Sequence, residues 1–203
     1  MIFDHLVVGG SDLDAARACV EDALGVAMQT GGAHEVFQTH NALMALEDGL
    51  YLEAIAPNPA VPAPVRPRWY DLDRFSGPAR LSNWACAVRD MDQALADMPE
   101  GVGAPVEVRR GDLHWRMAVS EAGTTPFDNL WPALIEWPEG VHPAGLLTPT
   151  GVRLRRFTIV HPHGTDMSQA LSHHLTDDRV AVETADTPAL HAVFDTPHGE
   201  RSL

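Results

Sequence analysis

The chain has no lysine, only two cysteines and no long apolar run among its 203 residues. All 14 basic residues are arginine, which excludes chemistry through a lysine Schiff base. Cys19 and Cys86 are too few for a disulfide framework and suit a reducing compartment. No segment approaches the roughly 20 apolar residues of a membrane-spanning helix, and no signal-peptide pattern is present. We therefore expect a cytoplasmic protein.

The charge balance and the missing motifs narrow the function further. The net charge is -14, which argues against nucleic acids and anionic membrane surfaces as partners. Gly9-Gly10 lacks the GxGxxG spacing of a dinucleotide-binding loop, and no GxSxG nucleophile elbow occurs. We therefore expect the protein to bind a small-molecule ligand or substrate. The chain is long enough to bury a sizeable core.

One order of elements recurs along the chain. A strand at 2–8 is followed by a helix and by three strands at 35–38, 42–47 and 50–56. Asp48-Gly49 predicts a tight hairpin turn between the last two strands. A second unit repeats this order. Its first strand is at 81–88 and its helix begins at 90. Its three further strands are at 106–109, 114–120 and 132–137. A shorter third unit has strands at 154–160, 180–185 and 190–195, with a helix at 166–175. The predicted helix caps are Ser11 with Asp14, Asp90 with Gln93, and Asp166 with Gln169.

Repetition of this kind predicts the architecture better than any single residue does. We expect an α+β fold, in which repeated βαβββ modules form a curved mixed sheet around a cavity and a shorter βαββ unit completes the domain. The modules span 1–57 and 81–145, and the third unit spans 150–203. A proline-rich, stiff and extended connector joins the two modules over 58–80.

Two strands each carry one polar side chain among apolar neighbours. Because side chains alternate along a strand, His5 shares a face with Phe3 and Val7, opposite the residues expected to pack under a helix. Glu53 stands in the same way on its own strand. An imidazole and a carboxylate on one concave face suit a divalent metal. The alternatives are a histidine bonded to backbone and a glutamate paired with an arginine.

Several segments together resemble the glyoxalase-like branch of the vicinal oxygen chelate superfamily. They are Asp4-His5-Leu6-Val7-Val8, Thr39-His40-Asn41-Ala42-Leu43, Tyr51-Leu52-Glu53-Ala54-Ile55-Ala56-Pro57, Leu134-Ile135-Glu136-Trp137 and His142-Pro143-Ala144. The resemblance implies paired βαβββ modules and a divalent metal such as Zn, Ni, Mn or Fe, with His5 and Glu53 as ligands. It also implies a homodimer and a lyase or isomerase that acts on a small substrate with vicinal oxygens.

The second module departs from the family pattern. Glu136 matches the last-strand carboxylate, but Asn83 stands where many metal-binding members have histidine or glutamine. We therefore predict that Glu136 is the catalytic base that moves the proton, while Asn83 contacts substrate. A plain ion pair between Glu136 and Arg116 is the structural alternative.

His40, His114 and Trp115 are the remaining candidates for substrate contact. Two other functions stay open beside the lyase or isomerase. A metal-free protein of the same fold would bind and sequester a small molecule. An Fe(II) ring-cleaving dioxygenase would need two histidines and one carboxylate, so His40 or His114 would have to join His5 and Glu53.

Overall fold

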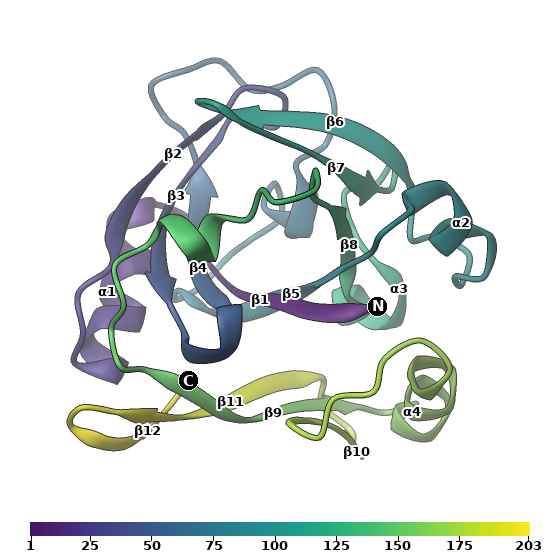
Figure 1. Ribbon diagram of the computed structural model, residues 1–203. Coiled ribbons are helices and arrows are strands. Elements are labelled where there is room, and N and C mark those ends of the chain that lie inside the picture. Colours follow the sequence, from purple (N-terminus) through teal and green to yellow (C-terminus); the bar gives the residue numbers. More distant parts are fainter.

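The computed structural model describes residues 1–203 as an α+β protein with two sheets, a curled sheet of eight strands and a smaller one of four (Figure 1). The strands of the larger sheet are β1 (Ile2–Gly9), β2 (Gln29–His34), β3 (Thr39–Ala45), β4 (Tyr51–Pro57), β5 (Arg80–Ala87), β6 (Ala104–Arg110), β7 (Leu113–Val119) and β8 (Ala133–Glu136). Those of the smaller sheet are β9 (Arg153–His161), β10 (Val180–Thr184), β11 (Ala189–Thr196) and β12 (Gly199–Ser202). The helices are α1 (Leu13–Leu24), α2 (Met91–Ala96), α3 (Pro126–Asn129) and α4 (Gly164–Ser172), with short 3-10 turns η1 (Glu47–Gly49), η2 (Trp69–Asp71) and η3 (Pro143–Leu146).

The order of strands in the larger sheet is that of two paired βαβββ modules. It runs β2-β3-β4-β1-β5-β8-β7-β6, so the two halves mirror each other about the β1–β5 contact. The first and last strands of each module pair in parallel, whereas β1 and β5 pair antiparallel. The fold predicted from the repeated element order is confirmed.

The two edge strands of this sheet, β2 and β6, approach each other as the sheet curls (Figure 1). A glycine allows the approach at one point. A Cβ on Gly32 would lie 2.8 Å from Cγ of Arg110, which is closer than two carbon atoms pack. The sheet therefore nearly closes on itself.

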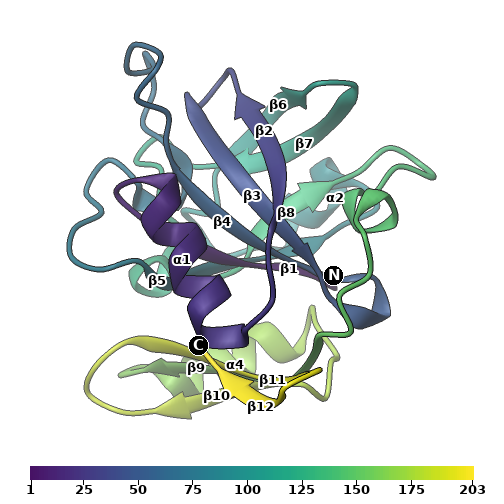
Figure 2. The same ribbon diagram turned by 90° about the vertical axis from the view of Figure 1, so that its left-hand side faces the viewer.

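Each face of the larger sheet has its own apolar core. On the convex face, side chains of β1 and β5 pack with α1 and with the smaller sheet, as the contacts of Phe157 with Phe3 and Trp84 show. Figure 2 shows the smaller sheet below the larger one, with α1 beside both. The concave face holds a second cluster that includes Val7, Ile55 and Trp115. No helix combines the length and apolar character needed to cross a membrane.

The helix starts agree with the sequence prediction in one case of three. Asp90 caps α2 and accepts from the N–H of Gln93, as predicted. In α1 the cap is Asp12 rather than Ser11, and it accepts from the N–H of Ala15. Helix α4 begins two residues before Asp166 and has no side-chain cap.

Two strand predictions are wrong in detail. Residues 35–38 form the turn between β2 and β3, because β2 lies earlier, at Gln29–His34. The predicted turn at Asp48-Gly49 is present, with φ of 65° and 78°. The third unit has one strand more than predicted, β12, and forms its own sheet beneath the larger one.

The connector between the modules is more than a spacer. Its η2 turn inserts Trp69, Tyr70 and Leu72 into the concave core, where all three are buried. Tyr70 and Asp71 have φ of 58° and 57°, a left-handed conformation that costs a bulky residue about 1–3 kcal/mol. Packing in the concave core therefore holds this turn in a conformation that its residues disfavour.

Candidate functional site

A β-bulge in β1 brings two consecutive polar residues to the concave side. The pairing of β1 with β5 shifts register between Phe3 and His5, so Phe3 joins the convex core instead of sharing the His5 face. Asp4 and His5 are then both buried, and Asp4 Oδ1 accepts from His5 Nδ1 at 2.6 Å. Because Nδ1 donates to Asp4, Nε2 presents its lone pair to the cavity.

Asp4 is a buried carboxylate with three donors. Besides His5, it accepts from Trp137 Nε1 at 3.0 Å and lies 3.0 Å from His142 Nε2. Burial alone would raise the pKa of Asp4, but the hydrogen bonds from His142 and His5 outweigh it and hold that pKa well below its usual range. Asp4 is therefore a fixed anion that orients His5 and ties the segment carrying His142 to β1.

Glu53 faces His5 across the β1–β4 pair. Its Oε2 lies 3.7 Å from His5 Nε2, and its Oε1 accepts from Asn41 Nδ2. The amide oxygen of Asn41 in turn accepts from the N–H of Gly32 at 2.9 Å. A Cβ at Gly31 would collide with that oxygen, so the glycine permits the approach. Asn41 is thereby held as a donor toward Glu53.

His34 completes this network on the far side of Asn41. Its Nε2 lies 3.5 Å from Asn41 Nδ2, and its Nδ1 lies 3.0 Å from Thr39 Oγ1. Burial, helped by the positive charge of Arg110, lowers the pKa of His34 to about 3. The imidazole is therefore neutral at physiological pH and supports Asn41 without adding charge.

Two tyrosines flank the His5–Glu53 pair. The Tyr70 hydroxyl lies 3.4 Å from His5 Nε2, and the Tyr51 ring stacks on the His5 ring at 4.4 Å. Burial, followed by the charges of Asp4 and Glu53, raises the pKa of both tyrosines well above the usual value, so they remain phenols. Tyr70 is a hydroxyl donor next to the pair.

The space around the pair is narrow. Its volume is about 10 Å³, enough for about one water molecule. The walls include Trp69, Trp115 and Trp137, and the indole N–H groups of Trp69 and Trp115 have no hydrogen-bond partner. A substrate has to displace part of this aromatic wall to reach His5 and Glu53.

The donor set does not fit the predicted divalent metal. A catalytic zinc site ordinarily has three protein ligands. Here no three side chains of His, Cys, Asp or Glu are arranged to hold an ion, and only His5 and Glu53 face each other. Asn41 turns its N–H group, not its oxygen, toward them. The metal-ligand role of His5 and Glu53 stays a prediction that this geometry does not support.

Metal analysis tests this directly. We expect well under one equivalent of Zn, Ni, Mn or Fe per chain after dialysis of the untagged protein, because two ligands hold such ions weakly. Elemental analysis of the wild type and of the His5→Ala/Glu53→Ala double variant makes the comparison. One tightly bound equivalent in the wild type that is lost in the variant would contradict this expectation and restore the metal site.

Glu136 lies apart from the pair. Its Oε2 accepts from Arg116 Nη1 at 2.9 Å, and its other oxygen lies 3.4 Å from the N–H of Met91 at the start of α2. Arg116 also bonds Asp92 of α2. Glu136 is thus on the side of the sheet that α2 covers, in the ion pair that was the structural alternative. This position does not support its predicted role as the catalytic base.

The predicted substrate contacts separate into two groups. Trp115 lines the cavity, and Asn83 pairs in register with Val7, on the same face of the sheet as His5. His114 is exposed and points away from the cavity that its neighbour lines. His40 alternates with Asn41 and so falls on the opposite face of β3. Neither histidine joins His5 and Glu53 in the set that the dioxygenase alternative needs.

Sequence reasoning missed Asp4, His34, Asn41 and Tyr70. Asn41 could have been recognised from the sequence. It is the only amide side chain in a mostly apolar strand, and the unusual pair Gly31-Gly32 lies in the strand before it. Asp4 had none, since the bulge that turns it inward breaks the alternation from which faces are predicted. Tyr70 lies in the segment that was treated as a connector.

The chain is similar to one family model and to several solved structures. A family model described as a glyoxalase-like domain matches residues 3–175. A hypothetical protein from Staphylococcus aureus aligns with a TM-score of 0.62 at 12% identity, over 93% of this chain and 88% of that one. Methylmalonyl-CoA epimerase from Streptomyces coelicolor aligns with a TM-score of 0.45 at 19% identity, over 70% of this chain and 97% of that one. A homoprotocatechuate 2,3-dioxygenase variant from B. fuscum gives 0.42 at 16% identity, over 96% and 50%. No curated protein matches the chain.

Paired βαβββ modules in one curled sheet are the architecture that the sequence predicted. Because the family model spans most of its length, the chain belongs to the glyoxalase-like domain family.

Proposed function

We propose that this protein is a lyase or isomerase that moves a proton on a small substrate with neighbouring oxygens. The observation that carries the proposal is the buried pair of His5 and Glu53, 3.7 Å apart, with Asp4 behind His5 and Asn41 behind Glu53. Burying two such groups is costly unless they are paired, and each is held by a dedicated partner. Arrangements of this kind are typical of acid–base catalysis.

Each residue has a role in such a reaction. Glu53 takes the proton from a carbon next to a carbonyl group, and the C–H bonding pair forms the enolate. The Tyr70 hydroxyl donates to the developing oxyanion, since burial keeps it protonated. Before the reaction the same hydroxyl lies 3.4 Å from His5 Nε2, and its proton turns from this nitrogen to the oxyanion as the enolate forms. Glu53 then returns the proton to the adjacent carbon, and the neighbouring hydroxyl proton passes to the former carbonyl oxygen, which completes the isomerisation.

Proton exchange with solvent tests the proposal without knowledge of the product. Small 2-oxo acids, 2-hydroxy acids and 2-hydroxyketones are incubated with the protein in D₂O, and deuterium uptake next to the carbonyl or hydroxyl group is followed by ¹H NMR. We expect exchange in at least one compound, slowed about 10²-fold or more by His5→Asn. The matched control is His114→Asn, an exposed histidine of the same module pair, which should leave the rate unchanged. Equal rates in the two variants would contradict the proposal.

A metal-free binding protein is the second candidate. Two observations favour it: the pair lacks a third ligand, and aromatic side chains fill the space around it. It predicts ligand binding without deuterium exchange in any compound. The same NMR samples distinguish the two functions, because binding shifts protein signals whereas catalysis changes the substrate.

A further inference from the structure

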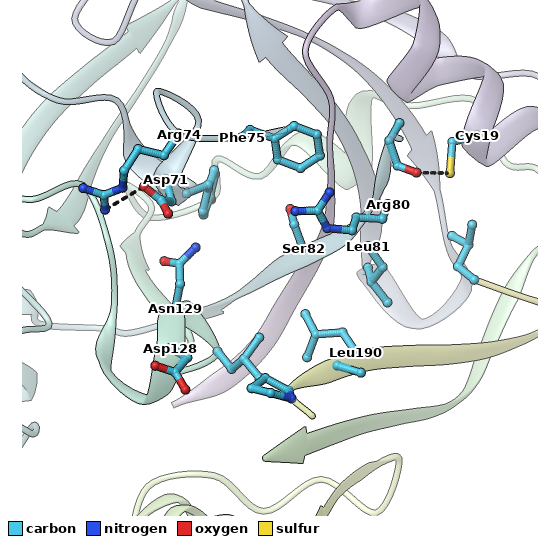
Figure 3. Close-up of a pocket in the computed structure, with 16 residues that line it drawn as sticks. Cys19, Asp71, Arg74, Phe75, Arg80, Leu81, Ser82, Asp128, Asn129 and Leu190 are labelled. Carbon is cyan, nitrogen blue, oxygen red and sulfur yellow. Dashed lines mark hydrogen bonds and ion pairs between the residues drawn. The ribbon is translucent and has the colours of Figure 1, made fainter. Parts of the chain in front are cut away.

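The molecule has a pocket of about 510 Å³ beside the His5–Glu53 cavity, within the usual size range of small-molecule sites. It lies between the end of the connector, the start of β5 and the start of β11, with α1 at its rim (Figure 3). Phe75, Leu81, Leu130 and Leu190 provide much of its apolar wall. The narrow cavity at the pair has no room for a substrate, whereas this pocket has.

Two left-handed segments form one side of the pocket. Tyr70 and Asp71 belong to the first, and Asp128 and Asn129, with φ of 53° and 69°, belong to the second. Residues in this conformation cluster at ligand clamps and active sites. The second segment is tied to β5, because Asn83 Nδ2 donates to the carbonyl of Asn129 at 3.0 Å.

A polar atom without a partner lies at the same place. Ser82 lines the pocket, and its buried Oγ has no hydrogen-bond partner. Buried polar atoms are seldom left unpaired in native proteins. A ligand that brings a hydroxyl group would satisfy it.

Tyr70 connects the pocket to the catalytic pair. Its side chain lines both spaces, and its hydroxyl is 3.4 Å from His5 Nε2. A molecule that fills the pocket therefore meets Tyr70 at its inner end.

One arginine of the lining, Arg80, is free to pair with a negative charge at the outer end of a ligand. The Arg80 guanidinium lies 4.2 Å from the Phe75 ring centroid, and its Nη1 donates to the carbonyls of Ser76 and Pro78. These contacts fix its orientation, and Arg80 has no carboxylate partner. Arg74 is already neutralised by Asp71, at 2.8 Å.

We propose that this pocket binds the body of the substrate, a medium-chain carboxylate that carries the neighbouring oxygens at its inner end. The carboxylate pairs with Arg80, the chain packs against the apolar wall, and the inner oxygens reach Ser82 and Tyr70. This inference rests on the proposed function for the reaction, but the binding itself is measured separately.

Cys19 makes the binding measurable. It lines the pocket and is partly exposed, whereas Cys86, the second cysteine, is fully buried and serves as an internal control. The rate of iodoacetamide alkylation at Cys19 is measured by mass spectrometry with a series from 3,4-dihydroxybutyrate to 7,8-dihydroxyoctanoate. We expect protection to strengthen with chain length and to reach at least fivefold.

Two variants identify the contacts. Leu190→Trp fills the pocket and should abolish protection, with circular dichroism to confirm folding. Arg80→Gln replaces an exposed side chain and should weaken protection by the carboxylates at least fivefold, yet spare protection by 1,6-hexanediol. Arg89→Gln is the matched surface control. No protection by any compound, or equal protection of Arg80→Gln and wild type, would overturn the inference.

These outcomes are independent of the reaction. Protection of Cys19 that persists in Glu53→Gln, together with absent deuterium exchange in the wild type, would refute the proposed function and keep the pocket. Exchange on short compounds without protection of Cys19 would do the reverse.

Discussion

Replacing Glu53 by glutamine should slow substrate proton exchange by about 10² to 10⁴-fold, the usual contribution of a general base. Glutamine keeps an oxygen to accept from Asn41 but has no basic carboxylate. The matched control is Glu136→Gln, because sequence reasoning assigned the base to Glu136 and the structure places that residue in an ion pair with Arg116. We expect Glu136→Gln to retain the wild-type rate.

The two variants also distinguish the chemistry from folding. Both proteins should show wild-type circular dichroism, and Glu53→Gln should bind its ligand as the wild type does. A large loss in Glu136→Gln with none in Glu53→Gln would return the base to the second module and contradict the geometry of the buried pair.

Asp4→Asn should destabilise the protein by about 3 kcal/mol at neutral pH, because buried donors left without an acceptor cost about 1–3 kcal/mol each. An asparagine in this place faces three donors, from His5, Trp137 and His142, and offers only one acceptor oxygen to them. Urea unfolding of the variant and wild type measures the difference. Asp92→Asn, which removes an exposed partner of Arg116, is the control and should cost about 1 kcal/mol or less.

The destabilisation should depend on pH in one direction. Because the folded-state pKa of Asp4 is lowered, its contribution is complete above the unfolded-state pKa of about 4 and is lost as pH falls toward the folded-state value. The stability difference between wild type and Asp4→Asn should therefore be constant from neutral pH down to about pH 5 and shrink below about pH 4. A difference that stays constant to pH 3 would show that the carboxylate charge is not its source.

The architecture was predictable because it is repeated. The same order of elements occurs twice. The cap at Asp90 and the turn at Asp48-Gly49 depend only on residues that are close in the sequence, so the local sequence predicts them. The position of β2 was not predictable in this way. Its strand contains Gly31-Gly32, which have low strand propensity and are explained only by the close approach of Asn41 and Arg110.

The central pair of the site was predictable from the sequence, but the residues that hold this pair were not. His5 and Glu53 stand out as polar residues in apolar strands, and the structure brings them together. Their partners depend on tertiary features: the bulge that turns Asp4 inward, and the packing that buries Tyr70 from the connector. Glu136 also stands out in an apolar strand, yet it pairs with Arg116 of β7, the alternative that the sequence left open, and α2 adds Asp92 to the same arginine.

The near closure of the larger sheet has a consequence for aggregation. Unpaired strand edges are the usual sites at which β proteins join into larger assemblies, but β2 and β6 turn theirs toward each other. The smaller sheet has two edges: β10, against which α4 packs, and β12, which is short and carries Glu200 and Arg201. Strand-to-strand growth is therefore opposed at both sheets, and the homodimer implied by the family resemblance would have to form through side chains rather than through an added strand.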